Sequence, residues 1–363
     1  MISTRYDRTR DEIADLLADE PAYRLDQIWE GLYRDCAEPE DWTTLPKTLR
    51  ERLAADLPRA LTEVTRSLSD DGQTVKYLWE LIDGHRIETV LMLYPDRATV
   101  CVSSQAGCAM ACSFCATGQA GFSRHLGVGE IVEQVALARR EALALDRRVS
   151  NIVFMGMGEP LANTTAVFEA CRRINGDLGI SARSITVSTV GIIPGIRALA
   201  EFELPVNLAV SLHSAADSSR DPIVPINRRY PLDDLVEVCG EYLRERRRRV
   251  SFEWALIDGV NDSDTDAEQL ARLCRRLRPS AHVNLIPLNP TPGYATVGSS
   301  PARVRAFRQR LEELGVNATV RQNRGTEIAA ACGQLAASGG DGAQPVALTS
   351  PGGTGGASSS RPA

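Results

Sequence analysis

The spacing of hydrophobic residues divides the chain into stretches for which we predict different structures. Up to about residue 70, apolar side chains recur every three or four positions, as in the segments 11–17 and 25–33. This spacing is typical of helices that bury one face. We therefore expect residues 1–72 to form a helical domain.

A β-hairpin is predicted directly after this domain. Residues 75–82 and 86–93 are rich in strand-forming residues, and they flank Asp83-Gly84. Asp-Gly between two such runs is typical of a tight hairpin turn, because both residues tolerate a positive φ. We expect residues 73–97 to form a hairpin that extends the domain that follows.

Strand-like and helix-like patterns alternate from about residue 98. Strands are expected at 98–103, 150–155, 184–188, 205–211, 249–256 and 281–286. Helices are expected at 128–145, 163–174, 231–247 and 263–277, with a shorter one near 194–201. Repeated βα units predict a parallel sheet or barrel with right-handed crossovers, in which the functional site lies at the C-terminal ends of the strands.

The end of the chain changes in composition. A helix at 301–314 and a strand at 317–322 are expected to complete a core domain over residues 98–336. Of the last 26 residues, 15 are Gly, Ser or Pro. We expect residues 337–363 to be a disordered tail, because such a composition is typical of flexible extensions.

The overall composition predicts a folded cytoplasmic protein. Hydrophobic residues make up 43% of the chain, which is enough for a buried core. No apolar run approaches the roughly 18 residues of a membrane span, and the charged N-terminus lacks the apolar segment of a signal peptide. The nine cysteines are therefore not expected to form a disulfide framework, because the cytosol keeps thiols reduced.

Charge leaves the partner undecided. The net charge of −6 argues weakly against a nucleic-acid partner, and the first 70 residues carry 16 acidic and 10 basic side chains. However, 39 of the 41 basic residues are arginine, whose guanidinium group suits phosphate. The same bias can also reflect a GC-rich genome.

Three cysteines lie on one short loop after the first core strand. Cys108, Cys112 and Cys115 have the spacing C-x3-C-x2-C. Structural zinc needs four ligands, and no fourth Cys or His follows at a suitable spacing, since His125 is ten residues on. Three thiolates suit an iron–sulfur cubane with one open iron. We favour the cluster, with zinc as the alternative.

Further motifs accompany this loop in order along the chain. They are Cys101-Val102-Ser103-Ser104-Gln105, Met155-Gly156-Met157-Gly158-Glu159-Pro160-Leu161, Ser188-Thr189-Val190-Gly191, Ser211-Leu212-His213 and Ala331-Cys332-Gly333-Gln334-Leu335. Together with the cysteine loop they resemble the RlmN family of the radical S-adenosylmethionine (AdoMet) superfamily, over about residues 24–335. The resemblance implies an α/β fold, a partial (β/α)6 barrel with an N-terminal helical accessory domain that binds RNA.

The RlmN family comprises dual-specificity adenine-C2 methyltransferases. The resemblance implies methylation of 23S rRNA at the peptidyl-transferase centre and of tRNAs at the adenine 3′ of the anticodon. Adenine C2 is electron-poor and cannot attack the methyl group of AdoMet, so a radical route with a low-potential electron source is needed. A [4Fe-4S] cluster on Cys108, Cys112 and Cys115 would supply it, with AdoMet bound at the open iron.

The resemblance also assigns roles to two other cysteines. Cys332 would take a methyl group from a first AdoMet, and a radical formed from a second would abstract hydrogen from it. The methylene group would then add to adenine C2, and Cys101 would release the product through a transient disulfide with Cys332. Taken singly, each cysteine is most simply a small buried hydrophobic residue.

The family's proton acceptor corresponds to Glu88. Its neighbours Ile87 and Val90 make it part of an expected strand, so a solvent-facing carboxylate is the alternative. A general base must first reach its proton and then have a suitable pKa. Whether Glu88 or Cys101 removes the C2 proton stays open.

The predicted AdoMet contacts follow successive strands. They are Gly158, Glu159, Ser188, Ser211, Leu212, His213 and Asn289. Small residues allow close approach of the backbone to a ligand, and a carboxylate can accept hydrogen bonds from the ammonium group of AdoMet. Without the resemblance, Gly-Glu-Pro would be an ordinary turn and His213 a packed or capping residue.

The expected partners are 23S rRNA, tRNA and an electron donor such as flavodoxin, with a monomer as the default and no membrane contact. Phosphate contacts are expected from arginines such as Arg124, Arg172, Arg173 or the run 246–249. One alternative is a Cfr-type enzyme, which methylates C8 of the same ribosomal adenine. The other is a non-catalytic, zinc-stabilised RNA-binding protein.

Overall fold

Most of the chain forms one continuous sheet with helices around it. The computed structural model describes residues 3–69, 72–279, 281–289, 296–322, 324–330 and 333–335. The predicted tail, 337–363, lies outside these residues. Ten strands form the sheet in the order β1-β2-β3-β4-β7-β8-β9-β10-β11-β12. They span Leu61–Leu68, Thr74–Leu81, Arg86–Leu93, Ala98–Cys101, Val149–Phe154, Ile185–Thr189, Asn207–Ser211, Val250–Leu256, His282–Pro287 and Ala318–Val320.

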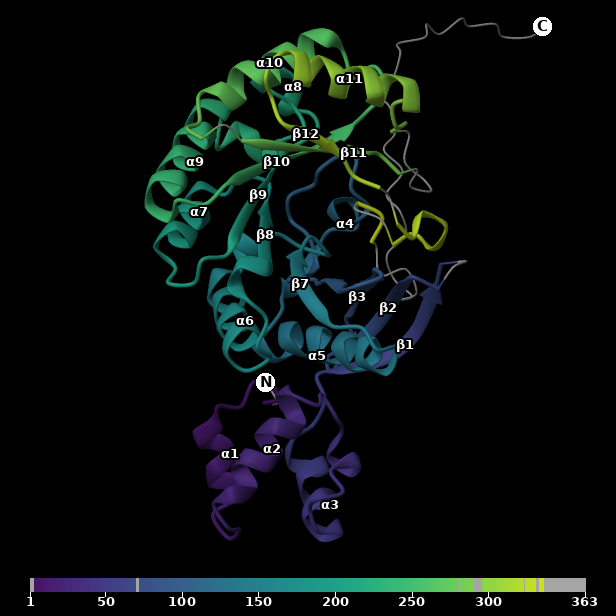
Figure 1. The fold of residues 1–363 in the computed structure, drawn as a ribbon, viewed down its shortest axis with the longest axis vertical. Helices are drawn as coiled ribbons and strands as arrows, with labels where there is room; N and C mark the ends of the chain where they lie inside the picture. Colours follow the sequence, from purple (N-terminus) through teal and green to yellow (C-terminus); the bar gives the residue numbers. More distant parts are fainter. Residues whose placement is uncertain are drawn as a thin grey trace, which may run out of the picture.

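The strands from β4 to β12 curve into a partial barrel (Figure 1). Every neighbouring pair among them is parallel. Helices cover the convex side: α5 (Val128–Ala144), α6 (Thr164–Gly176), α7 (Ile193–Glu201), α9 (Leu232–Arg246), α10 (Asp264–Arg275) and α11 (Pro301–Glu313). This confirms the predicted α/β fold class, and β12 adds a strand to the (β/α)6 core.

The predicted hairpin is present, and a further strand extends it. β2 pairs antiparallel with β3, and β3 pairs antiparallel with β4. The prediction of helix up to about residue 70 is wrong for β1, which pairs antiparallel with β2. Leu61, Val64 and Leu68 have the spacing of a helix, but Thr62, Val64 and Thr65 are β-branched and favour a strand. Hydrogen bonding to β2 stabilises the strand over the helix.

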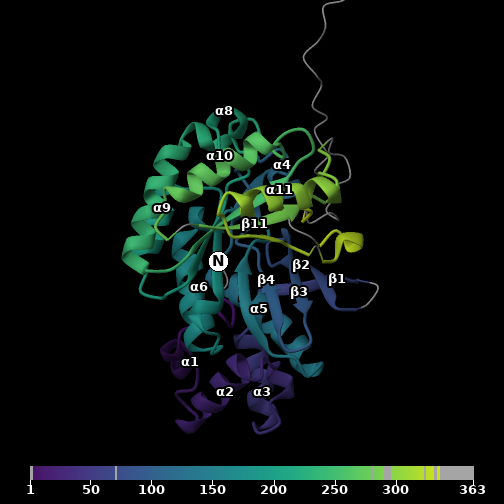
Figure 2. The same cartoon turned by 45° about the horizontal axis from the view of Figure 1, so that its top comes forward.

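Three helices form the N-terminal part of the chain. They are α1 (Arg10–Leu16), α2 (Tyr23–Tyr33) and α3 (Lys47–Asp56). Thr9 and Glu12 form a capping box that begins α1. Figures 1 and 2 show the three helices together at the outer side of the barrel, beside α5. None of the helices in the described part of the chain combines the length and apolar character of a transmembrane segment.

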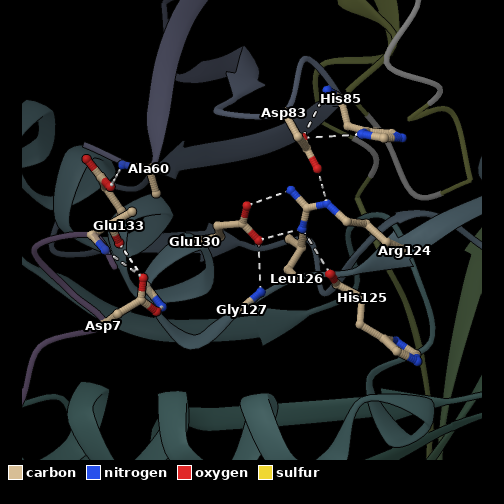
Figure 3. A network of polar contacts seen from close by, with 12 residues as sticks. Asp7, Ala60, Asp83, His85, Arg124, His125, Leu126, Gly127, Glu130 and Glu133 are labelled. Carbon is tan, nitrogen blue, oxygen red and sulfur yellow. Dashed lines mark hydrogen bonds and ion pairs between the residues drawn. The ribbon is translucent and has the colours of Figure 1, made fainter. Parts of the chain in front are cut away.

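Buried polar contacts attach this part to the barrel. The Asp7 carboxylate accepts a 2.7 Å hydrogen bond from Gly129 N, at the start of α5. The Glu133 carboxylate, also on α5, accepts one of 2.6 Å from Ala60 N (Figure 3). Burial raises the pKa of Glu133 to about 7. The start of β1 and the N-terminal segment are therefore both fixed on α5.

Candidate active site

A small second sheet frames the cysteine loop. β5 (Gln105–Gly107) pairs with β6 (Phe122–His125), and the loop runs from β5 to α4 (Ala116–Gln119). Cys108 N donates a 2.7 Å hydrogen bond to the carbonyl of Gly121. A Cβ on Gly107, whose φ is +79°, would lie 2.1 Å from that oxygen. Only glycine fits this position, so the two-stranded sheet fixes where the loop begins.

The three thiols of this loop, those of Cys108, Cys112 and Cys115, line one cavity. Burial raises the pKa of Cys108 to about 12 and also raises the pKa of Cys112. Thiols bind a metal as thiolates, and buried, mutually repelling thiolates need a cationic centre beside them. The loop therefore fits a cluster.

The ends of four parallel strands form the facing wall of this cavity. It carries Gly156, Gly158 and Glu159 after β7, Ser188 on β8, Ser211 and His213 at and after β9, and Glu253 on β10. Five of the seven predicted AdoMet contacts thus lie in the cavity of the cysteines. This is the arrangement expected where the carboxyl ends of parallel strands meet.

Two glycines bring the β7 end close to β4 and β5. A Cβ on Gly156 would lie 2.6 Å from the carbonyl oxygen of Val102. A Cβ on Gly158, whose φ is +104°, would lie 2.6 Å from Gln105 Cβ. A real Cβ atom does not lie this close to another atom. At both positions, therefore, any residue other than glycine would collide with its neighbour.

Glu159 holds two loops through its carboxylate. Oε1 accepts a 3.0 Å hydrogen bond from Leu161 N, and Oε2 accepts one of 2.8 Å from Val190 N. Burial raises its pKa to about 7, in spite of these bonds. Each carboxylate oxygen has a second lone pair, which leaves room for an ammonium group, and a cation there would favour the ionised form.

The β8 and β9 ends supply hydroxyl and imidazole groups. Ser188 Oγ and Ser211 Oγ lie 3.5 Å apart. His213 Nδ1 accepts a 2.9 Å hydrogen bond from Ala255 N, and burial lowers its pKa to about 3. The ring is therefore neutral and carries its proton on Nε2. It packs edge-on against Phe114 of the cysteine loop, with centroids 4.6 Å apart.

Two predicted AdoMet contacts are not brought to the cavity. Leu212 is fully buried in the hydrophobic core, and its N–H donates to the Glu253 carbonyl at 3.0 Å. Asn289 is 3% exposed, and its Oδ1 accepts a 3.2 Å hydrogen bond from Thr326 Oγ1. Neither side chain lines the cavity, because strand direction turns Leu212 inward and Asn289 faces the C-terminal segment.

A second cavity adjoins the first. The two share Met155, Ile286 and Leu335 in their walls. Cys101, at the end of β4, lines the second cavity and is 7% exposed. The predicted resolving thiol therefore faces the interior of the barrel, beside the cavity of the cysteine loop.

Described residues on either side of Cys332 line the two cavities. Cys332 itself lies outside the described residues. Ala330 lines the second cavity, and Gly333, whose φ is +82°, lines the first. The Gly333 carbonyl accepts a 2.8 Å hydrogen bond from Ala116 N at the start of α4, so the cysteine loop holds the residue after Cys332.

Glu88 faces the interior and not the solvent. It is 3% exposed, and its Oε1 lies 3.1 Å from Lys76 Nζ. The alternative of a solvent-facing carboxylate is therefore wrong. β3 runs next to β4, which carries Cys101, so the predicted proton acceptor and the predicted resolving thiol lie on neighbouring strands.

An ion pair between the buried Glu253 and the half-buried Arg321 joins the two cavities, and no sequence motif had pointed to it. Glu253 lines the first cavity, and its Oε1 accepts a 2.8 Å hydrogen bond from Asn284. Glu253 Oε2 lies 3.2 Å from Arg321 Nη2, and Arg321 lines the second cavity. The signal was a charged residue between Phe252 and Trp254, in the apolar part of a strand.

Arg124, a predicted phosphate contact, is engaged within the protein. Figure 3 shows its guanidinium group between the carboxylates of Asp83 and Glu130. These hydrogen bonds raise the pKa of Arg124. The residue joins the hairpin turn to α5 and is not a free cation.

The other predicted arginines are also occupied or lie away from the site. Arg172 pairs with two glutamates. Arg173 is 9% exposed and donates to backbone carbonyls of residues 6–8. The run 246–249 precedes β10, at the end of the strand opposite to the cavities. None of these arginines lines either cavity.

Comparison with known proteins defines the class. Residues 102–271 match the Radical SAM superfamily. The crystal structure of a radical SAM methyltransferase from Sphaerobacter thermophilus is 50% identical, with a TM-score of 0.88 over 92% of this chain and 99% of that one. The fold is thus that of a radical AdoMet enzyme.

Comparison of sequences defines the family. A protein of Frankia casuarinae named probable dual-specificity RNA methyltransferase RlmN is 52% identical over 91% of this chain and 82% of its own length. One of the same name from Chloroflexus aurantiacus is 48% identical over 91% and 92%. The chain belongs to the RlmN family. It is an AdoMet-dependent enzyme, and the family implies a 4Fe-4S cluster.

Proposed function

We propose that this enzyme methylates C2 of adenine in 23S rRNA, at the peptidyl-transferase centre, and in tRNAs, at the adenine 3′ of the anticodon. The observation that carries the proposal is the pair of adjoining cavities. One holds the three thiols and five predicted AdoMet contacts, and the other holds Cys101. The names of the relatives supply the substrate class.

The first cavity would hold the cofactors. Cys108, Cys112 and Cys115 would ligate a [4Fe-4S] cluster and leave one iron for AdoMet. When bound, this pair supplies a carbon radical that can abstract hydrogen from a methyl group. Glu159 would accept hydrogen bonds from the ammonium group, and the hydroxyl groups of Ser188 and Ser211, with the Nε2–H of His213, would orient other polar groups of AdoMet.

The second cavity would hold the adenine and the thiol chemistry. Cys332 carries the methyl group as a thioether, so the carbon that adds to C2 stays attached to the protein. A one-electron acceptor of the iron–sulfur class, which the first cavity would hold, would take one electron from the radical adduct, and Glu88 would then accept the C2 proton. Cys101 thiolate attacks the Cys332 sulfur, an S–S bond forms, and the electron pair of the broken C–S bond goes to the product carbon, which takes a proton.

The test is to identify the methylated nucleoside. Reconstituted enzyme is incubated anaerobically with AdoMet, a reductant and unmodified 23S rRNA fragment or tRNA, and nucleosides are resolved by mass spectrometry. We expect 2-methyladenosine, and none from Cys332→Ala. 8-Methyladenosine would show a Cfr-type enzyme, and neither product from protein that holds zinc would contradict the radical route.

Three further assignments belong to this proposal. The enzyme would use two AdoMet molecules per turnover, one for the methyl group and one for the radical. A low-potential protein such as flavodoxin would reduce the cluster. The enzyme would act as a monomer in the cytoplasm, where the transient disulfide is reduced again for the next turnover.

A further inference from the structure

A row of side chains that faces the barrel interior crosses β2, β3 and β4. Lys76 pairs with Val90, and Val90 pairs with Cys101. Directly paired residues of antiparallel strands share a face, and so do residues two apart on one strand. Glu88, two residues before Val90, therefore faces the interior together with Lys76 and Cys101. Val90 and Cys101 line the second cavity, so this row is part of its surroundings.

Lys76 contacts two groups that the proposed chemistry needs. Its Nζ lies 3.1 Å from Glu88 Oε1, and the side chains are only 13% and 4% exposed. The same Nζ donates a hydrogen bond to the carbonyl of Ala329 at 3.3 Å. An ammonium group has three N–H donors, so it can serve both acceptors at once. The charge is thereby placed inside the protein, where lysine is rare unless paired.

The second contact holds the stretch that leads to Cys332. Ala329 lies three residues before Cys332 and has a left-handed backbone, with φ +51°. Four residues earlier in the same segment, Gly325 packs so closely on β2 that a Cβ would lie 2.9 Å from Thr74 Cγ2. Gly325 and Ala329 therefore both contact β2, the first at Thr74 and the second at Lys76.

We propose that Lys76 is a positioning residue for methyl transfer, whose ammonium group fixes the Glu88 carboxylate relative to residues 324–330, the stretch that leads to Cys332. The inference rests on the proposed function, which gives Glu88 and Cys332 their roles. A base must lie within hydrogen-bond reach of its proton, and small displacements of reacting groups slow a reaction strongly. In the step concerned, the C2–H bond breaks, the proton goes to a Glu88 oxygen, and the electron pair stays in the adenine ring. Lys76 acts on the two partners and not on the RNA.

The test measures the ratio of released 2-methyladenosine to 5′-deoxyadenosine, the product of AdoMet cleavage. We expect Lys76→Met to lower this ratio about 100-fold, the scale of a misplaced general base, and protein-bound RNA to accumulate on denaturing gels. Lys76→Arg, which keeps a cation, restores much of the ratio. In a Glu88→Gln background, Lys76→Met has a smaller effect, because part of its action passes through Glu88.

An ion pair on the convex side of the barrel offers a control. Arg197, on α7, lies 3.0 Å from the Glu241 carboxylate with its side chain 57% exposed, so Arg197→Met keeps the wild-type ratio. A ratio within threefold of wild type for Lys76→Met would overturn the inference. An equal loss of 2-methyladenosine and 5′-deoxyadenosine, together with a lower melting temperature, would also overturn it, because a merely structural role gives that result. A wild-type enzyme that forms no 2-methyladenosine would contradict the proposed function instead.

Discussion

At the scale of single residues, two glycines and one glutamate set the backbone around the first cavity. Gly156 and Gly158 let the end of β7 lie against Val102 and Gln105. Glu159 then fixes the next loops through hydrogen bonds to two backbone N–H groups. The backbone around the predicted AdoMet site is thus set by close packing before any ligand binds.

This packing predicts the effect of adding one methyl group. In Gly156→Ala the new Cβ would meet backbone atoms of Val102 and Ser103 at 2.6–2.8 Å, so β4 and β7 must separate. We expect a loss of about 1–3 kcal/mol in stability, as for other overpacked sites, and weaker AdoMet binding. Gly176→Ala is the control, because a Cβ there meets nothing within 4 Å. Equal melting temperatures for the two variants would contradict the packing argument.

The sequence predicted the residues that follow strand ends better than those whose direction depends on packing. Ser188, Ser211 and His213 lie in the cavity because the ends of parallel strands meet there. Leu212 shares a motif with two of them but faces the core. It directly follows Ser211, the last residue of β9, and its N–H still bonds to β10, so its side chain takes the face opposite to that of Ser211. Glu253 was not predicted as a site residue. Its role depends on the ion pair with Arg321, which is distant in the sequence.

At the scale of elements, helix α5 supports the start of β1. Glu133 is 1% exposed and accepts a hydrogen bond from Ala60 N. The spacing of Leu61, Val64 and Leu68 cannot reveal this strand, because its partner β2 and its support α5 are remote in the sequence. The hairpin of β2 and β3 was predictable, since its turn and both strands are local.

The buried Glu133 predicts a pH dependence of stability. Burial raises its pKa to about 7, whereas glutamate in an unfolded chain titrates near 4.3. The folded state therefore binds the extra proton, and stability falls as the pH rises from about 4.5 to 7, by about 3 kcal/mol from this group.

Glu133→Gln removes this contribution, so the variant gains stability relative to wild type at pH 8 but little at pH 5. Urea unfolding at both pH values measures the difference. Glu245→Gln, at an exposed position on α9, should change neither value. A Glu133→Gln variant that is less stable than wild type at pH 8 would mean that the hydrogen bond to Ala60 needs the charge.

At the scale of the whole molecule, the barrel was predictable and the RNA-binding surface was not. Alternating βα patterns are local and repeated, and every expected strand and helix of the core is present within two residues of its predicted bounds. The candidate arginines, in contrast, are bonded within the protein or lie beside the wrong end of β10. Composition alone does not show which cations a fold has already paired.

The central claim about the whole molecule is that the methyl carbon reaches RNA while it is attached to Cys332. Deuterated AdoMet with a CD3 group tests this claim most directly. Hydrogen abstraction from the Cys332 methyl group removes one deuterium, so 2-methyladenosine should carry two deuterium atoms and one hydrogen from solvent. A product that keeps all three deuterium atoms would show direct transfer of an intact methyl group and would contradict the account.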